Sequence, residues 1–172
     1  LFSIGAIASS PLRVRCIMAT VEHIDRLVDA RELIDARLRL SIVAALTNLT
    51  SGTLRKLWKD VHGVRPPNGK LPESVLSFIT NVRADADLAA FLSLYQRLNG
   101  DFEVDSRRLL KAWAAHQQLC GPLDINAAFH ALRDVRAKLV SFIRCPKCHA
   151  FYIYDTALTL TSRCPFCATS PV

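Results

Sequence analysis

Four cysteines near the end of the sequence are the residues best suited to bind a metal. They form two Cys-x-x-Cys pairs separated by fifteen residues: Cys145 and Cys148, then Cys164 and Cys167. A two-residue gap lets both thiolates of a pair reach one ion from a tight turn, and two such turns complete a tetrahedral site. The spacing therefore predicts one structural Zn²⁺ per chain, held by all four thiolates.

Two other kinds of cysteine site remain open from the spacing alone. Two disulfides would use the same residues, although disulfides are rare in proteins of the cytoplasm. An iron site of the rubredoxin type is the second alternative. Its turns usually carry Gly after the second Cys, where this chain has His149 and Ala168. The zinc site remains the favoured interpretation.

The sequence carries no pattern typical of an enzyme active site. A four-thiolate site has no open coordination position, so it stabilises structure instead of activating water. The chain contains no Gly-rich phosphate loop, no Gly-x-Ser-x-Gly motif and no His-Glu-x-x-His motif, and its five histidines stand apart from one another. We therefore expect no catalytic activity and no small-molecule substrate.

The segments around the cysteines are rich in residues that favour β-strands. Three short runs, 141–144, 151–154 and 158–161, are built mainly from Phe, Tyr, Ile, Leu and Thr. We expect them to be strands of a zinc ribbon over residues 141–172, clamped at one end by the metal. Five aromatic residues are available for the small core of the ribbon, or alternatively for stacking on nucleic-acid bases: Phe142, Phe151, Tyr152, Tyr154 and Phe166.

The chain before the ribbon, residues 18–140, is predicted to be a helical domain. Apolar side chains recur at the helical period across 21–40, with Thr20 as the expected N-cap, and later periodic runs cover about 84–98, 105–119 and 126–140. The predicted fold class is mainly α. It consists of a helical domain with a helix-turn-helix-like segment, followed by a small C-terminal four-cysteine zinc ribbon.

Residues 41–62 have the pattern of a helix-turn-helix. We expect a short helix over 41–46, a turn over 47–50 and a second helix over 51–62 that ends at Gly63. The turn contains Asn48 instead of the glycine often found there. The apolar side chains of the second helix that should point inward are Leu54, Leu57, Trp58 and Val61.

Basic residues are concentrated in and just after the second of these helices. Residues 51–70 contain five Lys or Arg and one Asp, so they carry +4 of the formal net charge of +7. The candidate DNA-contacting residues are Arg55, Lys56, Lys59, Arg65 and Lys70. We predict that these side chains contact DNA phosphates. The alternative is an ordinary solvated helix face.

Length and charge limit the remaining possibilities. The 172 residues suit one domain of ordinary size with a small appendage, and the basic balance is compatible with an anionic partner such as nucleic acid. No run of eighteen uncharged apolar residues occurs, so we expect no membrane-spanning helix. Residues 1–17 precede the single methionine, Met18, and we interpret them as a non-native or disordered extension.

Two motifs resemble the FlhC family of bacterial flagellar transcriptional activators. In that family a basic helix leads into a Gly-x-x-Pro-Pro-x-Gly-x-Leu-Pro loop. Residues 50–72 of this chain match that pattern at Gly63, Pro66, Pro67, Gly69, Leu71 and Pro72. The paired Cys-x-x-Cys motifs follow in the right order, and the resemblance runs from about residue 20 to residue 167.

The resemblance implies a partner, a target and a mode of action. It implies a hetero-oligomer with FlhD that binds promoter DNA, recruits RNA polymerase and switches on flagellar genes, in the cytoplasm and without catalysis. It also implies that the four cysteines are Zn ligands. Two apolar helix faces are candidates for contact with FlhD: Ile24, Leu27 and Val28, and Leu109, Leu110 and Trp113. A zinc-ribbon scaffold that does not bind DNA, or an enzyme subunit, is the alternative function.

Overall fold

The computed structural model describes residues 11–171, and the side chains of residues 20–171. Within this range the chain forms α1 (Pro11–Asp35), α2 (Leu40–Thr47), α3 (Ser51–His62), the 3-10 helix η1 (Val75–Phe78), α4 (Val82–Asn99), α5 (Ser106–Leu119), α6 (Ile125–Arg136), β1 (Ser141–Arg144), β2 (Phe151–Tyr154) and the 3-10 helix η2 (Thr159–Ser162). The predicted fold class is confirmed, because the described chain is mainly helical and ends in a small sheet beside four clustered cysteines. None of the described helices combines the length and apolarity needed to cross a membrane.

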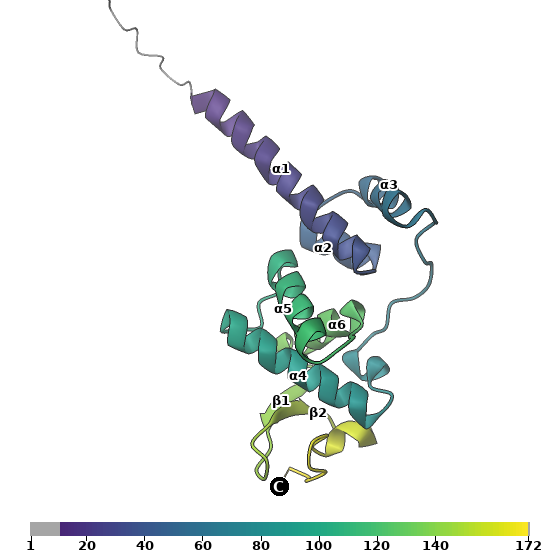
Figure 1. The fold of residues 1–172 in the computed structure, drawn as a ribbon, viewed down its shortest axis with the longest axis vertical. Helices are drawn as coiled ribbons and strands as arrows, with labels where there is room; N and C mark the ends of the chain where they lie inside the picture. The colour runs from purple at the N-terminus through teal and green to yellow at the C-terminus, as the bar shows by residue number, and fades with distance from the viewer. Residues whose placement is uncertain (1–10, 172) are drawn as a thin grey trace, which may run out of the picture.

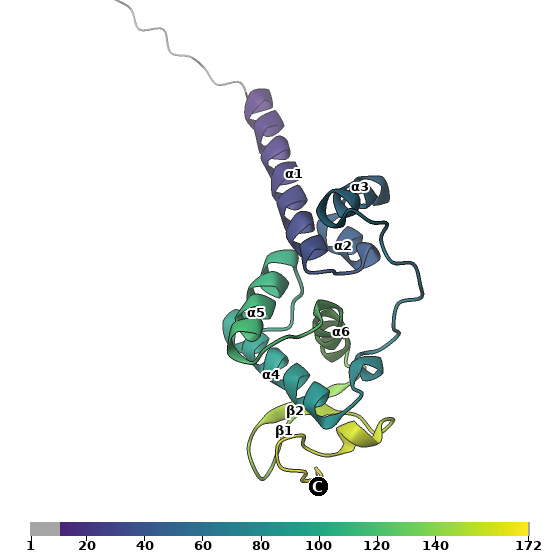
Figure 2. The same ribbon diagram turned by 45° about the vertical axis from the view of Figure 1, so that its right-hand side comes forward.

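The elements are arranged in three tiers along the longest axis of the molecule. Helix α1 projects from one end, with α2 and α3 packed on its C-terminal part; α4, α5 and α6 form the middle; the β1–β2 hairpin and η2 lie under α4 at the other end (Figures 1 and 2). One apolar core joins the tiers, because Leu33 of α1, Leu54 of α3, Phe91 of α4 and Ile153 of β2 all belong to the same buried cluster.

The start of α1 differs from the expectation. The helix begins at Pro11, a residue well suited to the first position of a helix because its nitrogen carries no hydrogen to leave unpaired. The prediction of Thr20 as N-cap is therefore wrong, since Thr20 lies inside α1. Residues 11–17 of the predicted extension are helical, whereas residues 1–10 lie outside the described residues, so its non-native or disordered character stays a prediction.

The prediction of a third ribbon strand over residues 158–161 is wrong. The β1–β2 pair is antiparallel, with Phe142 opposite Ile153, but residues 159–162 form the 3-10 helix η2. The Thr161 hydroxyl lies 2.9 Å from both the Leu158 and the Asp155 carbonyl oxygens, and the Ser162 hydroxyl donates to the Thr159 carbonyl. Such bonds offer the backbone an alternative to a strand, and β-propensity alone does not register them.

The ribbon packs directly on the helical part of the chain. Ala89 of α4 is fully buried in a second cluster with Cys145, Tyr152 and Cys164. At the other side of the hairpin, the rings of Phe142 and Phe102 meet edge to face with their centroids 5.8 Å apart. The division of the chain at residue 140 stays a prediction, and these contacts show that the two predicted parts share a buried boundary.

Candidate metal centre and nucleic-acid interface

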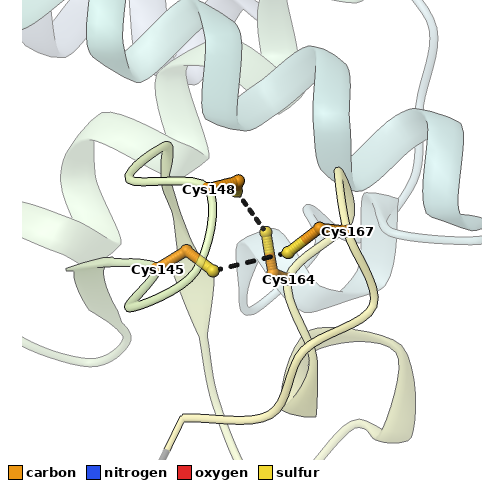
Figure 3. Close-up of side chains that lie close together, drawn as sticks. All are labelled: Cys145, Cys148, Cys164 and Cys167. Atoms are coloured by element: carbon orange, nitrogen blue, oxygen red, sulfur yellow. Dashed lines mark hydrogen bonds between the residues drawn. The ribbon is translucent and has the colours of Figure 1, made fainter.

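The four cysteine sulfurs converge on one point beneath α4. Cys145 and Cys167 Sγ lie 3.5 Å apart, Cys148 and Cys164 Sγ lie 3.6 Å apart, and all four sulfurs lie within 4.8 Å of one another (Figure 3). A tetrahedral zinc with Zn–S bonds of 2.3 Å would hold its sulfurs about 3.8 Å apart. The arrangement therefore fits one tetrahedral metal ion.

Two turns with the same backbone hydrogen bonds deliver the sulfurs. His149 N donates to Cys145 O at 3.0 Å, and Ala168 N donates to Cys164 O at 2.8 Å. The residue after the second cysteine of each pair is left-handed, with φ of 63° at His149 and 58° at Ala168. These are the two positions at which rubredoxin-type turns usually carry Gly, so this chain builds the same turn with residues that adopt it less readily.

The thiols of the cluster have opposing proton affinities. Burial raises the pKa of Cys164 to about 12. The Thr169 side chain, whose Oγ1 lies 3.3 Å from Cys167 Sγ, together with the Thr169 amide lowers the pKa of Cys167 to about 6. A divalent cation would stabilise all four thiolates together, since it supplies positive charge next to all four sulfurs.

The predicted helix-turn-helix is present at the expected place. Helix α2 ends at Asn48, which takes the left-handed conformation at φ 55°, and α3 begins after Thr50, whose Oγ1 accepts from Thr53 N at 3.3 Å. Gly63 ends α3 at φ 69°. These local signals fix both ends of α3, as the sequence predicts.

One side of α3 is buried and the other is exposed and basic. Leu54 and Trp58 are buried on the side of α3 that packs on α1 and α2, as predicted. Leu57 and Val61, which were also predicted to point inward, are only half-buried. Arg55, Lys56 and Lys59 are exposed, and none of the three forms an ion pair with a described residue.

The loop after α3 extends this basic surface. Arg65 is exposed and lines a cavity of about 390 Å³ together with Arg55 and Lys59. Lys70 differs from the other candidates because it pairs with Glu73, although both side chains stay exposed. Arg55, Lys59 and Arg65 therefore line one concave surface, to which Lys70 does not belong.

Sequence reasoning missed the residue that holds this loop. The Arg39 guanidinium donates to the carbonyl oxygens of Pro67 at 3.1 Å and Gly69 at 2.9 Å. These partners lie 28 and 30 residues further along the chain, so no local sequence pattern around Arg39 predicts the contacts.

The basic surface and the cysteine cluster lie at opposite ends of the molecule. Helix α3 stands beside α1, whereas the β1–β2 hairpin and η2, whose flanking turns carry the cysteines, lie below α4 in both views (Figures 1 and 2). In the ribbon, Tyr152 is fully buried, while Phe151 and Phe166 are 40% and 49% exposed and the Phe142 and Phe151 rings stack with centroids 5.4 Å apart. The ribbon aromatics thus divide between core and surface.

The two predicted apolar faces are each exposed only in part. Val21, Ile24 and Val28 on α1 are each about half exposed, at 51%, 53% and 50%. On α5, Leu109 is fully buried in the core, and the half-buried Trp113 donates from Nε1 to the Leu123 carbonyl at 2.8 Å. The prediction of a partner surface is therefore wrong for Leu109. Leu27 of the first predicted face and Leu110 of the second are half-buried against the core, and Leu110 and Trp113 line a cavity of about 630 Å³ together with Val28. Val21, Ile24 and Val28 form the exposed apolar stripe of α1.

The sequence of the whole described chain matches a known family. The family described as "Flagellar transcriptional activator (FlhC)" matches residues 13–171. The chain belongs to the FlhC family. Its role is therefore that of a flagellar transcriptional regulator, a class of protein that is not an enzyme class.

Individual relatives carry the same description. The flagellar transcriptional regulator FlhC of Sodalis glossinidius is 32% identical over 149 residues, covering 80% of this chain and 74% of the relative. The Proteus mirabilis FlhC is 29% identical over 134 residues, 72% of this chain and 68% of the relative. The Nitrosomonas eutropha FlhC is 26% identical over 164 residues, 91% of this chain and 84% of the relative.

Proposed function

We propose that the chain binds promoter DNA in a hetero-oligomer with FlhD and activates flagellar genes in the cytoplasm by recruiting RNA polymerase. Family membership supports the regulatory role and the flagellar target. The observation that carries the DNA-binding part is the exposed side of α3, where three cations have no counterion among the described residues. The α1 stripe of Val21, Ile24 and Val28 supports assembly, because it leaves an apolar strip for a partner to cover.

The geometry of α3 suits a DNA backbone. Arg55 and Lys59 are four residues apart, so they lie about 6 Å apart along one side of the helix. Lys56 follows Arg55 on the same exposed side. Cations on one exposed side of a helix can neutralise phosphates of a DNA backbone, and this neutralisation supplies much of the affinity of proteins for DNA.

We propose that the metal is Zn²⁺, one ion per chain, held by Cys145, Cys148, Cys164 and Cys167. The closed four-sulfur geometry supports this assignment, since zinc prefers tetrahedral thiolate sites and such sites do not leave room for a reacting water. Its role is to fold the ribbon. Elemental analysis of the purified protein should find about one zinc per chain, and iron or no metal would contradict the assignment.

The decisive experiment removes the charges of α3 within the complete complex. The triple variant Arg55/Lys56/Lys59→Ala, purified together with FlhD, should assemble and retain zinc but lose affinity for a flagellar promoter. For each lost phosphate contact, the slope of log K against log salt should fall by about 0.9. Footprinting on a flagellar promoter gives the site, and binding across a salt series gives the slope.

A matched control removes the same charge elsewhere. Arg97→Ala, Lys111→Ala and Lys138→Gln together remove three exposed cations from α4, α5 and the turn after α6. This control should keep both the affinity and most of the salt slope. If the α3 variant behaves like the control, α3 does not contact DNA, and the contact moves to FlhD or to Arg144, Lys147 and Arg163 of the ribbon.

A further inference from the structure

Arg39 fastens the loop of residues 63–72 to the start of α2. Its guanidinium donates to the carbonyl oxygens of Pro67, Gly69 and Lys70, at 3.1, 2.9 and 3.5 Å. Its own backbone N–H donates to Asn126 Oδ1 of α6 at 3.0 Å. The loop is therefore tied through one side chain to a point that is itself fixed to the helical core.

No other hydrogen bond from a described element reaches residues 64–72. Lys70 pairs with Glu73, but Glu73 follows directly in the same segment. Gly69 in this loop has φ 142°, a backbone conformation that residues with a side chain rarely adopt. The position of the loop therefore depends on Arg39 more than on any other polar contact.

The loop and α3 together line a basic cavity that is open to solvent on one side. The cavity of about 390 Å³ is lined by Arg55, Lys59, Arg65, Pro66 and Asn68. A smaller cavity of about 180 Å³ adjoins it, shares Arg55, and reaches Arg39 and Ser41 at the start of α2. Neither lining contains Asp or Glu, and Arg55, Lys59 and Arg65 form no ion pair with a described residue.

We infer that the cavity between α3 and the 63–72 loop binds a single phosphate group of the DNA backbone, and that Arg39 is the positioning residue that gives the cavity its shape. This inference rests on the proposed DNA binding and makes it specific. Three cations from two segments face one concave space without a counterion, which is the arrangement that an anion with several acceptor oxygens satisfies. Arg39 is placed outside the phosphate contact, because it does not line the larger cavity and its Nη1 and Nη2 are directed at loop carbonyls.

The test compares two Arg39 variants with an exposed arginine on α4. Arg39→Lys keeps the charge but lacks the planar fork that reaches several carbonyls at once, whereas Arg39→Ala removes both. Both variants, in complex with FlhD, should lose about tenfold in promoter affinity, the order expected when one charge-assisted contact is lost. Arg97→Ala removes an exposed charge outside both cavities and should leave the affinity unchanged.

Ethylation of individual promoter phosphates supplies a readout that a general loss of stability would not move. In the wild-type complex, ethylation of one phosphate should block binding. Variants Arg55→Ala, Arg65→Ala and Arg39→Lys should all become indifferent to ethylation of that same phosphate. The double variant Arg55→Ala/Lys59→Ala should lower the salt slope by about 0.9, the value for one phosphate, instead of about 1.8 for two.

The possible failures are distinguishable. If the wild-type complex does not bind the promoter, the proposed function fails. If the α3 variants weaken binding while Arg39→Lys keeps full affinity and the same ethylation pattern, the function stands and the role of Arg39 is overturned. If inorganic phosphate binds the cavity but no promoter phosphate is shared among the variants, the cavity is an anion site outside the DNA interface, which also overturns the inference.

Discussion

The two left-handed residues of the cysteine turns carry a local cost. A non-glycine residue in this conformation costs about 1–2 kcal/mol, whereas Gly avoids this cost and loses about 0.5–1 kcal/mol in chain entropy. His149→Gly and Ala168→Gly should therefore each raise the free energy of unfolding of the metal-loaded protein by about 0.5–1 kcal/mol. Denaturant titration measures the change. Ala114→Gly, in the middle of α5, is the control and should lower stability by about 1 kcal/mol.

Asp85 is the charged side chain of α4 least suited to its surroundings. It is fully buried, neither of its carboxylate oxygens has a hydrogen-bond partner among the described residues, and burial raises its pKa from 3.8 to about 7. The folded state therefore binds this proton more tightly than the unfolded state, so stability falls as pH rises from about 4 to 7 and the full penalty is present above pH 7.

Asp85→Asn should remove that penalty. At pH 8 the variant should be more stable than the wild type by roughly 2–4 kcal/mol, and at pH 5 the difference should be much smaller. Thermal unfolding at both pH values, with the metal content checked at each, measures the effect. Equal stability gains at the two pH values would mean that ionisation of Asp85 is not the cause.

At the scale of the element, α3 depends on its buried side chains. Leu54 is fully buried between α3 and its neighbours, so Leu54→Ala should lower the free energy of unfolding by about 2–5 kcal/mol. Leu57 is only half-buried, and Leu57→Ala should cost clearly less. Chemical denaturation compares the two. A larger loss for Leu57 would contradict the orientation of α3 described here.

Helix α1 presents an apolar stripe that the rest of the described chain does not cover. Because Ile24 and Val28 are half exposed, the variant Ile24→Ser/Val28→Ser should change stability little. Under the proposed assembly it should reduce co-purification with FlhD and self-association of the free chain, which sedimentation measures. The control Ile34→Ser alters a fully buried residue of the same helix and should unfold the protein instead.

The elements that the sequence predicts well are those with local signals. The ends of α3 follow from Thr50 and Gly63, and the cysteine cluster follows from spacing within and between two turns. The prediction of a third strand was wrong because the hydroxyl groups of Thr161 and Ser162 donate to nearby carbonyl oxygens. β-propensity takes no account of such hydrogen bonds. Arg39 was missed because its partners lie about thirty residues away, at a separation set by the fold.

At the scale of the whole molecule, the cysteine cluster packs against the helices as well as the ribbon. Ala89 of α4 is buried with Cys145, Tyr152 and Cys164, and Ile153 belongs to the core of the helices. Replacing Cys145 or Cys164 by Ser should therefore remove the metal and also lower the melting temperature of the helical part. Circular dichroism at 222 nm should show one transition at a lower temperature. An unchanged helical transition would mean that the ribbon and the helices unfold independently.

The burial of α4 against the ribbon also sets an order of events during synthesis. Ala89 leaves the ribosome before Cys164, which lies 75 residues later. At translation rates of about 5–20 residues per second, the last cysteine pair is synthesised roughly 4–15 seconds after Ala89. During this time the side of α4 that packs on the ribbon stays uncovered. Under the proposed metal binding, a nascent chain that meets no metal would keep this surface exposed for longer. The supply of metal during synthesis would then affect the fraction of chains that reach the folded state.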